Sequence, residues 1–348
     1  MESTLASLGF SLEAEQPHIS GERFLMAKNK QVLVGRQNKD HLRVVIKITN
    51  ISEGKKEIWK EKVARDLLMS VAFAADTIDF PKEIYWGETN GYLIWVTEFI
   101  GQEKVFVEHD LEEQFFLILK AFEAQEGFHA TTYEHIETVK KVFPVFYAKE
   151  YFSEFARFRK IFSEKNPNQT IENSLMVADE LLQQHKTIID KYCNYLTHTD
   201  FVPHNFRIRG RSIYMLDCSP EERTVHFGNK YEGWARFINY MTIHNPALNK
   251  LLLQYMKQNR DTEELLNLRL MRIYKLGFIL KFYAESLEKT EGDLRILTLE
   301  RIDFWHEILK YVIDNKEVPE NFVDNYKSKR DQLRSDGEKK RQKEFAVA

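Results

Sequence analysis

The chain contains few cysteines and no long hydrophobic run. Only Cys193 and Cys218 occur among its 348 residues, which is too few for a disulfide framework or for a zinc site made of four cysteines. Their scarcity favours a reducing, cytoplasmic setting. No stretch of about 18 apolar residues is present, so we expect no membrane-spanning helix and no membrane partner. The early acidic residues Glu2, Glu13 and Glu15 also argue against a secretory signal.

The chain also lacks a strong excess of charge of either sign. It has 50 lysines and arginines against 53 aspartates and glutamates, which gives a net charge of −3. We therefore expect neither a globally basic nucleic-acid binder nor nucleic acid as a partner. Aromatic residues, in contrast, are abundant, with 25 Phe and 15 Tyr. Because disordered chains are poor in aromatic residues, this composition indicates a folded protein with a substantial core.

The first hundred residues have the pattern of a small antiparallel sheet with one helix. Residues 31–36 and 42–48 are rich in β-branched and apolar side chains and are separated by turn-forming residues, which predicts a hairpin. Residues 58–72 then show the three-to-four spacing of an amphipathic helix. Residues 83–86 and 92–97 predict two more strands, and the Asn-Gly pair between them is typical of a tight hairpin turn.

The remainder of the chain has a mainly helical pattern. Residues 115–125, 175–195, 234–256 and 265–287 carry long amphipathic patterns. Residues 206–216 interrupt them with two strand-like halves around a glycine, which predicts a β-hairpin within the helical region. The sequence thus predicts an α+β fold of two lobes, with a small antiparallel β-sheet lobe that includes one helix and a larger, mainly helical lobe.

Four polar residues follow one another in a spacing that suits phosphoryl transfer. His198, Asp200 and Asn205 form the pattern His-x-Asp-x-x-x-x-Asn, and Asp217 follows twelve residues later, after the predicted hairpin. Phosphoryl transfer needs a carboxylate beside the acceptor hydroxyl, and oxygen ligands that hold Mg²⁺ against the nucleotide phosphates. An Asp and an Asn on one loop, with a second Asp after a hairpin that folds back, can converge on one metal ion. The alternative is that these groups only brace a turn.

This segment resembles the catalytic loop of the aminoglycoside phosphotransferase and choline kinase family, which has a protein-kinase-like fold. Pro203 stands where that family has a proline in the loop. The resemblance implies that Asp200 is the catalytic base and that Asn205 and Asp217 are the metal ligands. It also implies that His198 shapes the loop and does not shuttle a proton.

The resemblance extends to a lysine in the N-terminal lobe. Lys47 lies in a Val-Ile-Lys context, where the family's strand lysine contacts the α- and β-phosphates of the nucleotide. Its usual partner is a glutamate on the following helix. Glu57 and Glu61 are one turn apart on that helix, and we prefer Glu61 because it lies further inside it.

A second segment resembles the hinge that links the two lobes in this family. The resemblance implies that backbone groups of Glu98, Phe99 and Ile100 hydrogen-bond the adenine ring. A glycine-rich phosphate-binding loop before Lys47 is not evident, and residues 20–23 and 28–30 are the candidates for it.

These resemblances divide the chain into three parts. We expect a nucleotide-binding lobe over residues 1–100, a helical catalytic and substrate lobe over residues 101–318, and a charged C-terminal tail over residues 319–348. The last 22 residues of that tail carry a net charge of +4, which is typical of a solvated or frayed end and less often of a site for an anionic partner.

The function that we expect is an ATP- and Mg²⁺-dependent kinase that phosphorylates a hydroxyl of a small molecule. One alternative is a protein kinase of the same superfold, which the absence of an Ala-Pro-Glu-like anchor after Asp217 argues against. Another is a catalytically idle nucleotide-binding protein. The acceptor would bind the helical lobe, including residues 130–174, whose aromatic and acidic residues suit either a cationic acceptor or simple core packing. The identity of the acceptor and the oligomeric state stay open.

Overall fold

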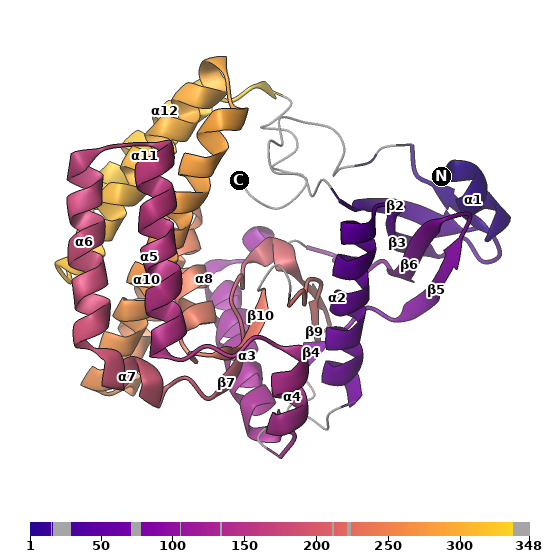
Figure 1. The fold of residues 1–348 in the computed structure, drawn as a ribbon, viewed down its shortest axis with the longest axis horizontal. Coiled ribbons are helices and arrows are strands. Elements are labelled where there is room, and N and C mark those ends of the chain that lie inside the picture. The colour runs from indigo at the N-terminus through magenta and orange to yellow at the C-terminus, as the bar shows by residue number, and fades with distance from the viewer. Residues whose placement is uncertain are drawn as a thin grey trace.

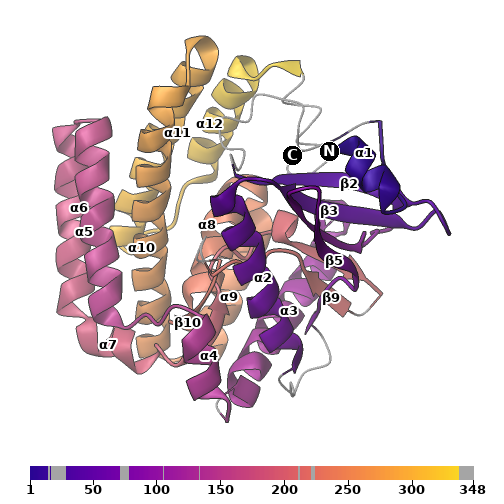
Figure 2. The same ribbon diagram turned by 45° about the vertical axis from the view of Figure 1, so that its right-hand side comes forward.

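The computed structural model of the 348-residue chain describes residues 1–14, 16, 29–70, 78–104, 106–132, 134–210, 212–220 and 224–336. Figure 1 shows a sheet with α2 beside it on one side of the molecule, and a bundle of long helices on the other. Figure 2 shows the same division after rotation. The prediction of a two-lobed α+β fold is confirmed.

The N-terminal lobe is built on one antiparallel sheet. Its strand order is β1-β2-β3-β6-β5. Val44, Ile46 and Ile48 are buried on one face of β3, and Lys47 between them faces the other side, as the alternation of a strand requires. The Asn-Gly turn joins β5 and β6, with positive φ values at both residues. The elements of this lobe are α1 (Glu2–Ser7), β1 (Phe10–Leu12), β2 (Gln31–Gln37), β3 (Arg43–Thr49), α2 (Ser52–Ser70), β5 (Glu83–Thr89) and β6 (Tyr92–Glu98).

Side-chain packing and a strand pair are among the contacts that join the two lobes. Ala64 and Leu68 of α2 pack into a cluster that includes Leu196, Met215 and Cys218 from the second lobe. A two-residue strand that follows α2 in the chain, β4 (Ile78–Asp79), pairs in parallel with β9 (Ser212–Met215) of the second lobe. The helix that carries Glu61 is therefore packed against Met215 and Cys218, which flank Asp217, one of the two predicted metal ligands.

The second lobe is mainly helical. The segment expected as one helix over residues 234–256 is two helices, because Pro246 cannot continue the first one and Asn245 caps the second through its side chain. The long helix α10 packs against α5, α8 and α11. The helices of this lobe are η1 (Phe106–Glu108), α3 (Leu111–Thr132), α4 (Ile136–Val142), α5 (Ala148–Lys165), α6 (Gln169–Gln184), α7 (Lys186–Lys191), η2 (Pro203–Asn205), α8 (Glu232–His244), α9 (Pro246–Asn259), α10 (Thr262–Ser286), η3 (Leu287–Lys289), α11 (Gly292–Ile313) and α12 (Glu320–Leu333).

Two small strand pairs frame the predicted catalytic loop. β7 (Tyr195–His198) pairs antiparallel with β10 (Val225–Gly228). β8 (Phe206–Arg209) and β9 form the predicted hairpin, in which Gly210 adopts a φ of 60° that favours glycine. The loop thus leaves one strand pair at His198 and enters the other at Phe206.

The aromatic residues of the segment 130–174 are mostly core. Phe143, Phe146, Tyr151 and Phe155 are all buried. Phe155 of α5 packs against Gly277 of α10, and a Cβ atom built on this glycine would lie 2.3 Å from the Phe155 ring. The contact between α5 and α10 therefore needs a glycine at this position. Core packing, and not a pocket for a cationic acceptor, accounts for these four aromatic side chains.

Some expectations fall on residues outside the described part of the chain. Residues 20–23 and residue 28, which were candidates for a phosphate-binding loop, lie outside the described residues. Residues 337–348 of the expected tail also lie outside them. The part of that tail that the structure describes contains α12, which buries Val323, Tyr326 and Arg330. In the described residues, the helices are too short or too polar to cross a membrane.

Candidate active site

The loop after β7 brings Asp200 and Asn205 into direct contact. The Asn205 side-chain amide donates hydrogen bonds to the Asp200 carboxylate at 2.9 Å and to the Asp200 backbone carbonyl at 2.8 Å. Asn205 lies at the end of the short helix η2, and its carbonyl accepts the Leu216 amide at 3.0 Å. Since both amide hydrogens of Asn205 point to Asp200, its side-chain oxygen is the atom that can face a cation.

Asp217 follows strand β9 and is held next to the same loop. Its backbone carbonyl accepts a hydrogen bond from His198 Nε2 at 2.7 Å. Its Oδ1 atom accepts from the Ser219 amide at 3.1 Å and from the Thr224 hydroxyl at 3.3 Å. The structure therefore pairs the four residues of the motif by hydrogen bonds, Asn205 with Asp200 and His198 with Asp217.

His198 is a buried, neutral member of this group. His198 is 2% exposed, and burial lowers the pKa of its imidazole from 6.5 to about 4. Nε2 carries the proton, because its partner is a carbonyl oxygen, and Nδ1 has no hydrogen-bond partner among the described residues. A neutral imidazole in this position connects β7 to the end of β9 without adding a charge beside Asp200.

Lys47 of β3 and Glu61 of α2 form an ion pair. Glu61 is the more deeply buried partner, with 3% of its side chain exposed against 16% for Lys47. Glu57, one turn earlier, instead accepts a hydrogen bond from Asn29 at 2.9 Å and lies 3.9 Å from Lys30. Of the two glutamates that the sequence left as partners of Lys47, the structure brings Glu61 to it.

Charged groups from both lobes act on the buried thiol of Cys218. This thiol is 3% exposed, and burial raises its pKa well above the ordinary value. The negative charges of Asp217 and Glu61 raise it further, whereas the positive charge of Lys47 opposes them. The thiol is thus under the charge of Asp217 in the helical lobe and of the ion pair in the sheet lobe, and it packs in one cluster with Ala64 and Leu68 of α2.

The predicted hinge begins at Glu98, the last residue of β6, which pairs with the strand of Lys47. The Glu98 amide donates to the Lys82 carbonyl at 2.9 Å, and the Phe99 amide donates to the Arg43 carbonyl at 3.0 Å. These two amides are therefore engaged inside the lobe and cannot donate to a nucleotide. Among the described residues, no hydrogen bond engages the Ile100 amide.

Arg236 of α8 is a residue of the site that the sequence did not indicate. Its Nε donates to Asp200 Oδ1 at 2.6 Å. Burial by itself would raise the pKa of Asp200, but the Arg236 and His204 charges outweigh it and hold the pKa well below its usual range. The signal that could have found Arg236 is the stripe of Arg236, Tyr240 and His244, which are spaced four residues apart on one helix face.

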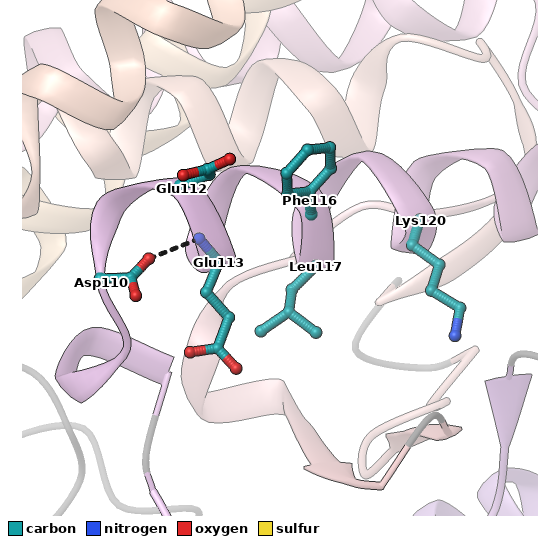
Figure 3. Close-up of a pocket in the computed structure, with 6 residues that line it drawn as sticks. All are labelled: Asp110, Glu112, Glu113, Phe116, Leu117 and Lys120. Carbon is teal, nitrogen blue, oxygen red and sulfur yellow. Dashed lines mark hydrogen bonds between the residues drawn. The ribbon is translucent and has the colours of Figure 1, made fainter.

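An open groove lies along the start of α3. Its volume is about 380 Å³. Figure 3 shows the six residues that line it, all from this part of the chain, and the hydrogen bond by which Asp110 caps the helix at the Glu113 amide. None of the sequence-predicted site residues lines this groove. The lining residues are Asp110, Glu112, Glu113, Phe116, Leu117 and Lys120.

Comparison with known proteins gives structural likeness without sequence likeness. No protein-family model and no curated protein matches the sequence. A mutant of aminoglycoside 2′-phosphotransferase-IIIa in complex with GDP has a TM-score of 0.58 at 14% identity, over 88% of this chain and 93% of that one. ADP-bound aminoglycoside phosphotransferase APH(2″)-Ib has a TM-score of 0.53 at 11% identity, over 82% and 92%. Macrolide 2′-phosphotransferase type I has a TM-score of 0.51 at 14% identity, over 85% and 93%.

These likenesses span nearly the whole of each solved structure, at identities that show the fold alone. They agree with the two-lobed α+β fold described above. The chain therefore has the kinase-like fold of the aminoglycoside and macrolide phosphotransferases.

Proposed function

We propose that this protein is an ATP- and Mg²⁺-dependent phosphotransferase that phosphorylates a hydroxyl of a small molecule. The observations that carry the proposal are two contacts, the Lys47–Glu61 ion pair and the Asp200–Asn205 hydrogen bond. The helix of Glu61 packs in one cluster with Met215 and Cys218, which flank Asp217. Similar solved structures are complexes with GDP and ADP, which supports a nucleotide as the phosphoryl donor.

Asp200 would orient the acceptor hydroxyl. Its low pKa keeps it ionised and makes it a weak proton acceptor. That suits phosphoryl transfer, whose loose transition state needs positioning and charge neutralisation more than early proton removal. The carboxylate accepts the hydrogen bond of the hydroxyl and receives the proton late, as the new oxygen–phosphorus bond forms and the bond to the nucleotide diphosphate breaks.

Asn205 and Asp217 fit a magnesium ion. Both offer oxygen donors, and Asn205 turns its amide nitrogen away toward Asp200. No group of three or more His, Cys, Asp or Glu side chains in the described residues is arranged to hold a metal by itself. This agrees with Mg²⁺, which typically uses one or two carboxylates together with the substrate phosphates. When bound, the ion would neutralise charge on those phosphates.

The sheet lobe would hold the nucleotide. Lys47 would contact the phosphates, and Glu61 fixes the direction of its ammonium group. At the hinge, the Ile100 amide and the carbonyls of Glu98 and Phe99 would meet the adenine edge, because the amides of Glu98 and Phe99 are engaged elsewhere. Residues 1–100 would then form the nucleotide lobe and residues 101–318 the acceptor lobe of a cytoplasmic enzyme.

The test is the destination of the terminal phosphate. The protein is incubated with γ-labelled ATP, Mg²⁺ and a cell extract, after which small molecules are separated from macromolecules. We expect label in the small-molecule fraction, and its loss with Asp200→Ala. Label on protein in trans would favour a protein kinase. ATP binding without any transfer would favour the idle nucleotide-binding protein.

A further inference from the structure

Three arginines gather where α12 ends. This arginine cluster consists of Arg301 of α11, Arg330 of α12 and Arg334, which directly follows α12. Figures 1 and 2 show the end of α12 on the side of the helical bundle that faces the N-terminal lobe. Arg330 donates to Asp331 at 2.8 Å, and Arg301 hydrogen-bonds Tyr326.

Arg334 is the least satisfied member of the arginine cluster. Only 7% of its side chain is exposed, and its Nε has no hydrogen-bond partner among the described residues. Its closest ion pair, to Asp331, spans 3.6 Å. Burial, followed by the charges of Arg330 and Arg301, lowers the pKa of Arg334 to about 10. A buried guanidinium that faces two others is costly unless an anion compensates it.

Tyr240 belongs to α8, on which α12 packs, and it lies beside the catalytic loop. It is 7% exposed, and its hydroxyl also lacks a hydrogen-bond partner among the described residues. Burial raises the pKa of that hydroxyl, and the charges that act on it include those of Arg236, Asp200 and Arg334. Tyr240 also contacts the ring of His204, which belongs to the catalytic loop.

Arg334 of the arginine cluster and Tyr240 of α8 thus each carry a buried donor without a hydrogen-bond partner among the described residues. Arg236 pairs with Asp200, whereas Arg330 and Arg334 share Asp331, so three guanidinium groups face two carboxylates. A planar guanidinium with an open Nε matches a phosphate or carboxylate group, which accepts several hydrogen bonds at once. A cationic acceptor would be repelled from the same place.

We propose that the arginine cluster and Tyr240 form the acceptor subsite, and that the acceptor is a small alcohol carrying a phosphate or carboxylate group. The inference rests on the proposed phosphotransfer, since it places that anionic group beside the loop that would orient the hydroxyl. Arg334 and Tyr240 hold the anionic end, and the hydroxyl of the same molecule reaches Asp200.

The first experiment measures anion binding by the nucleotide-free protein. Inorganic phosphate is titrated calorimetrically into the full chain, with chloride at matched ionic strength as the reference. We expect phosphate affinity to fall about tenfold or more in Arg334→Gln, and by less in Tyr240→Phe, which keeps the ring and removes only the hydroxyl. Arg157→Gln is the matched control, because this exposed arginine of α5 pairs only locally, with Glu154.

Lys47→Met separates the subsite from the nucleotide site. Phosphate binding that survives in Lys47→Met and falls in Arg334→Gln supports the inference. Phosphate binding that is lost in Lys47→Met and unchanged in Arg334→Gln and Tyr240→Phe overturns it. The result does not depend on turnover, so it stands apart from the test of phosphotransfer itself.

The second experiment sorts the acceptor by charge. A small-molecule extract is divided by ion exchange into anionic, neutral and cationic pools, and each pool is offered with γ-labelled ATP. The inference requires labelled product from the anionic pool, with a reduced yield in Arg334→Gln. Product from only the cationic or neutral pool contradicts it. If no pool yields product although phosphate binds at Arg334, the acceptor role is wrong, and with it the proposed transfer.

Discussion

Lowering the pH from 7 to 5 should destabilise this protein through His198. The imidazole is buried with a pKa of about 4, against 6.5 in the unfolded chain. At pH 5 nearly every unfolded chain carries the proton, whereas only about one folded molecule in ten does. The unfolded state thus binds more protons, so stability falls as the pH drops below 6.5 and levels off below 4. From these two pKa values the loss at pH 5 is about 2 kcal/mol.

The assay compares the wild type with His198→Gln. Glutamine retains an N–H that can donate to the Asp217 carbonyl, and it does not titrate. Urea unfolding is followed at pH 7 and pH 5 for both proteins. All other titrating groups are shared, so the wild type should lose about 2 kcal/mol more unfolding free energy than the variant. Equal losses in the two proteins would refute the reasoning that His198 is a buried, neutral brace of the loop.

Three further outcomes follow from the site. Lys47→Met should lower kcat/KM for ATP about 10- to 100-fold, the cost of one charge-assisted hydrogen bond to phosphate; a wild-type value would remove Lys47 from the nucleotide site. Arg236→Gln should raise the pKa of Asp200, because burial then acts without the guanidinium, and should move the acid limb of the kcat/KM profile to higher pH; an unchanged profile would contradict this. Cys218 should react with iodoacetamide much more slowly in the folded protein than in urea, because burial raises its pKa; equal rates would show that the thiol is accessible.

Local patterns in the sequence were sufficient to predict both lobes. The strands around Lys47 and the hairpin between Asn205 and Asp217 show in short-range alternation and turn residues, and the structure contains them. The spacing from His198 to Asp217 likewise predicted one loop and one strand end, and these residues contact each other. Their roles in catalysis stay predictions.

Features that depend on packing could not be predicted in the same way. Helical periodicity could not by itself choose between Glu57 and Glu61, because one turn of helix separates them on the same side. The contact of Arg236 with Asp200 joins two elements that lie 36 residues apart. The arginine cluster depends on how α12 packs against α8 and α11, and the charge pattern of the tail alone favoured a solvated end. Such contacts follow from the tertiary arrangement, which a single sequence does not display.

The measurement that tests the account most directly is the rate of label transfer from γ-labelled ATP to the small-molecule fraction in four proteins. These are the wild type, Asp200→Asn, Asp217→Asn and Asp66→Asn. Asp66 is the control, because its exposed side chain pairs with Lys62 on α2. The account predicts that both site variants are slower by at least about 100-fold and that the control is unchanged. Wild-type transfer by Asp217→Asn would contradict it.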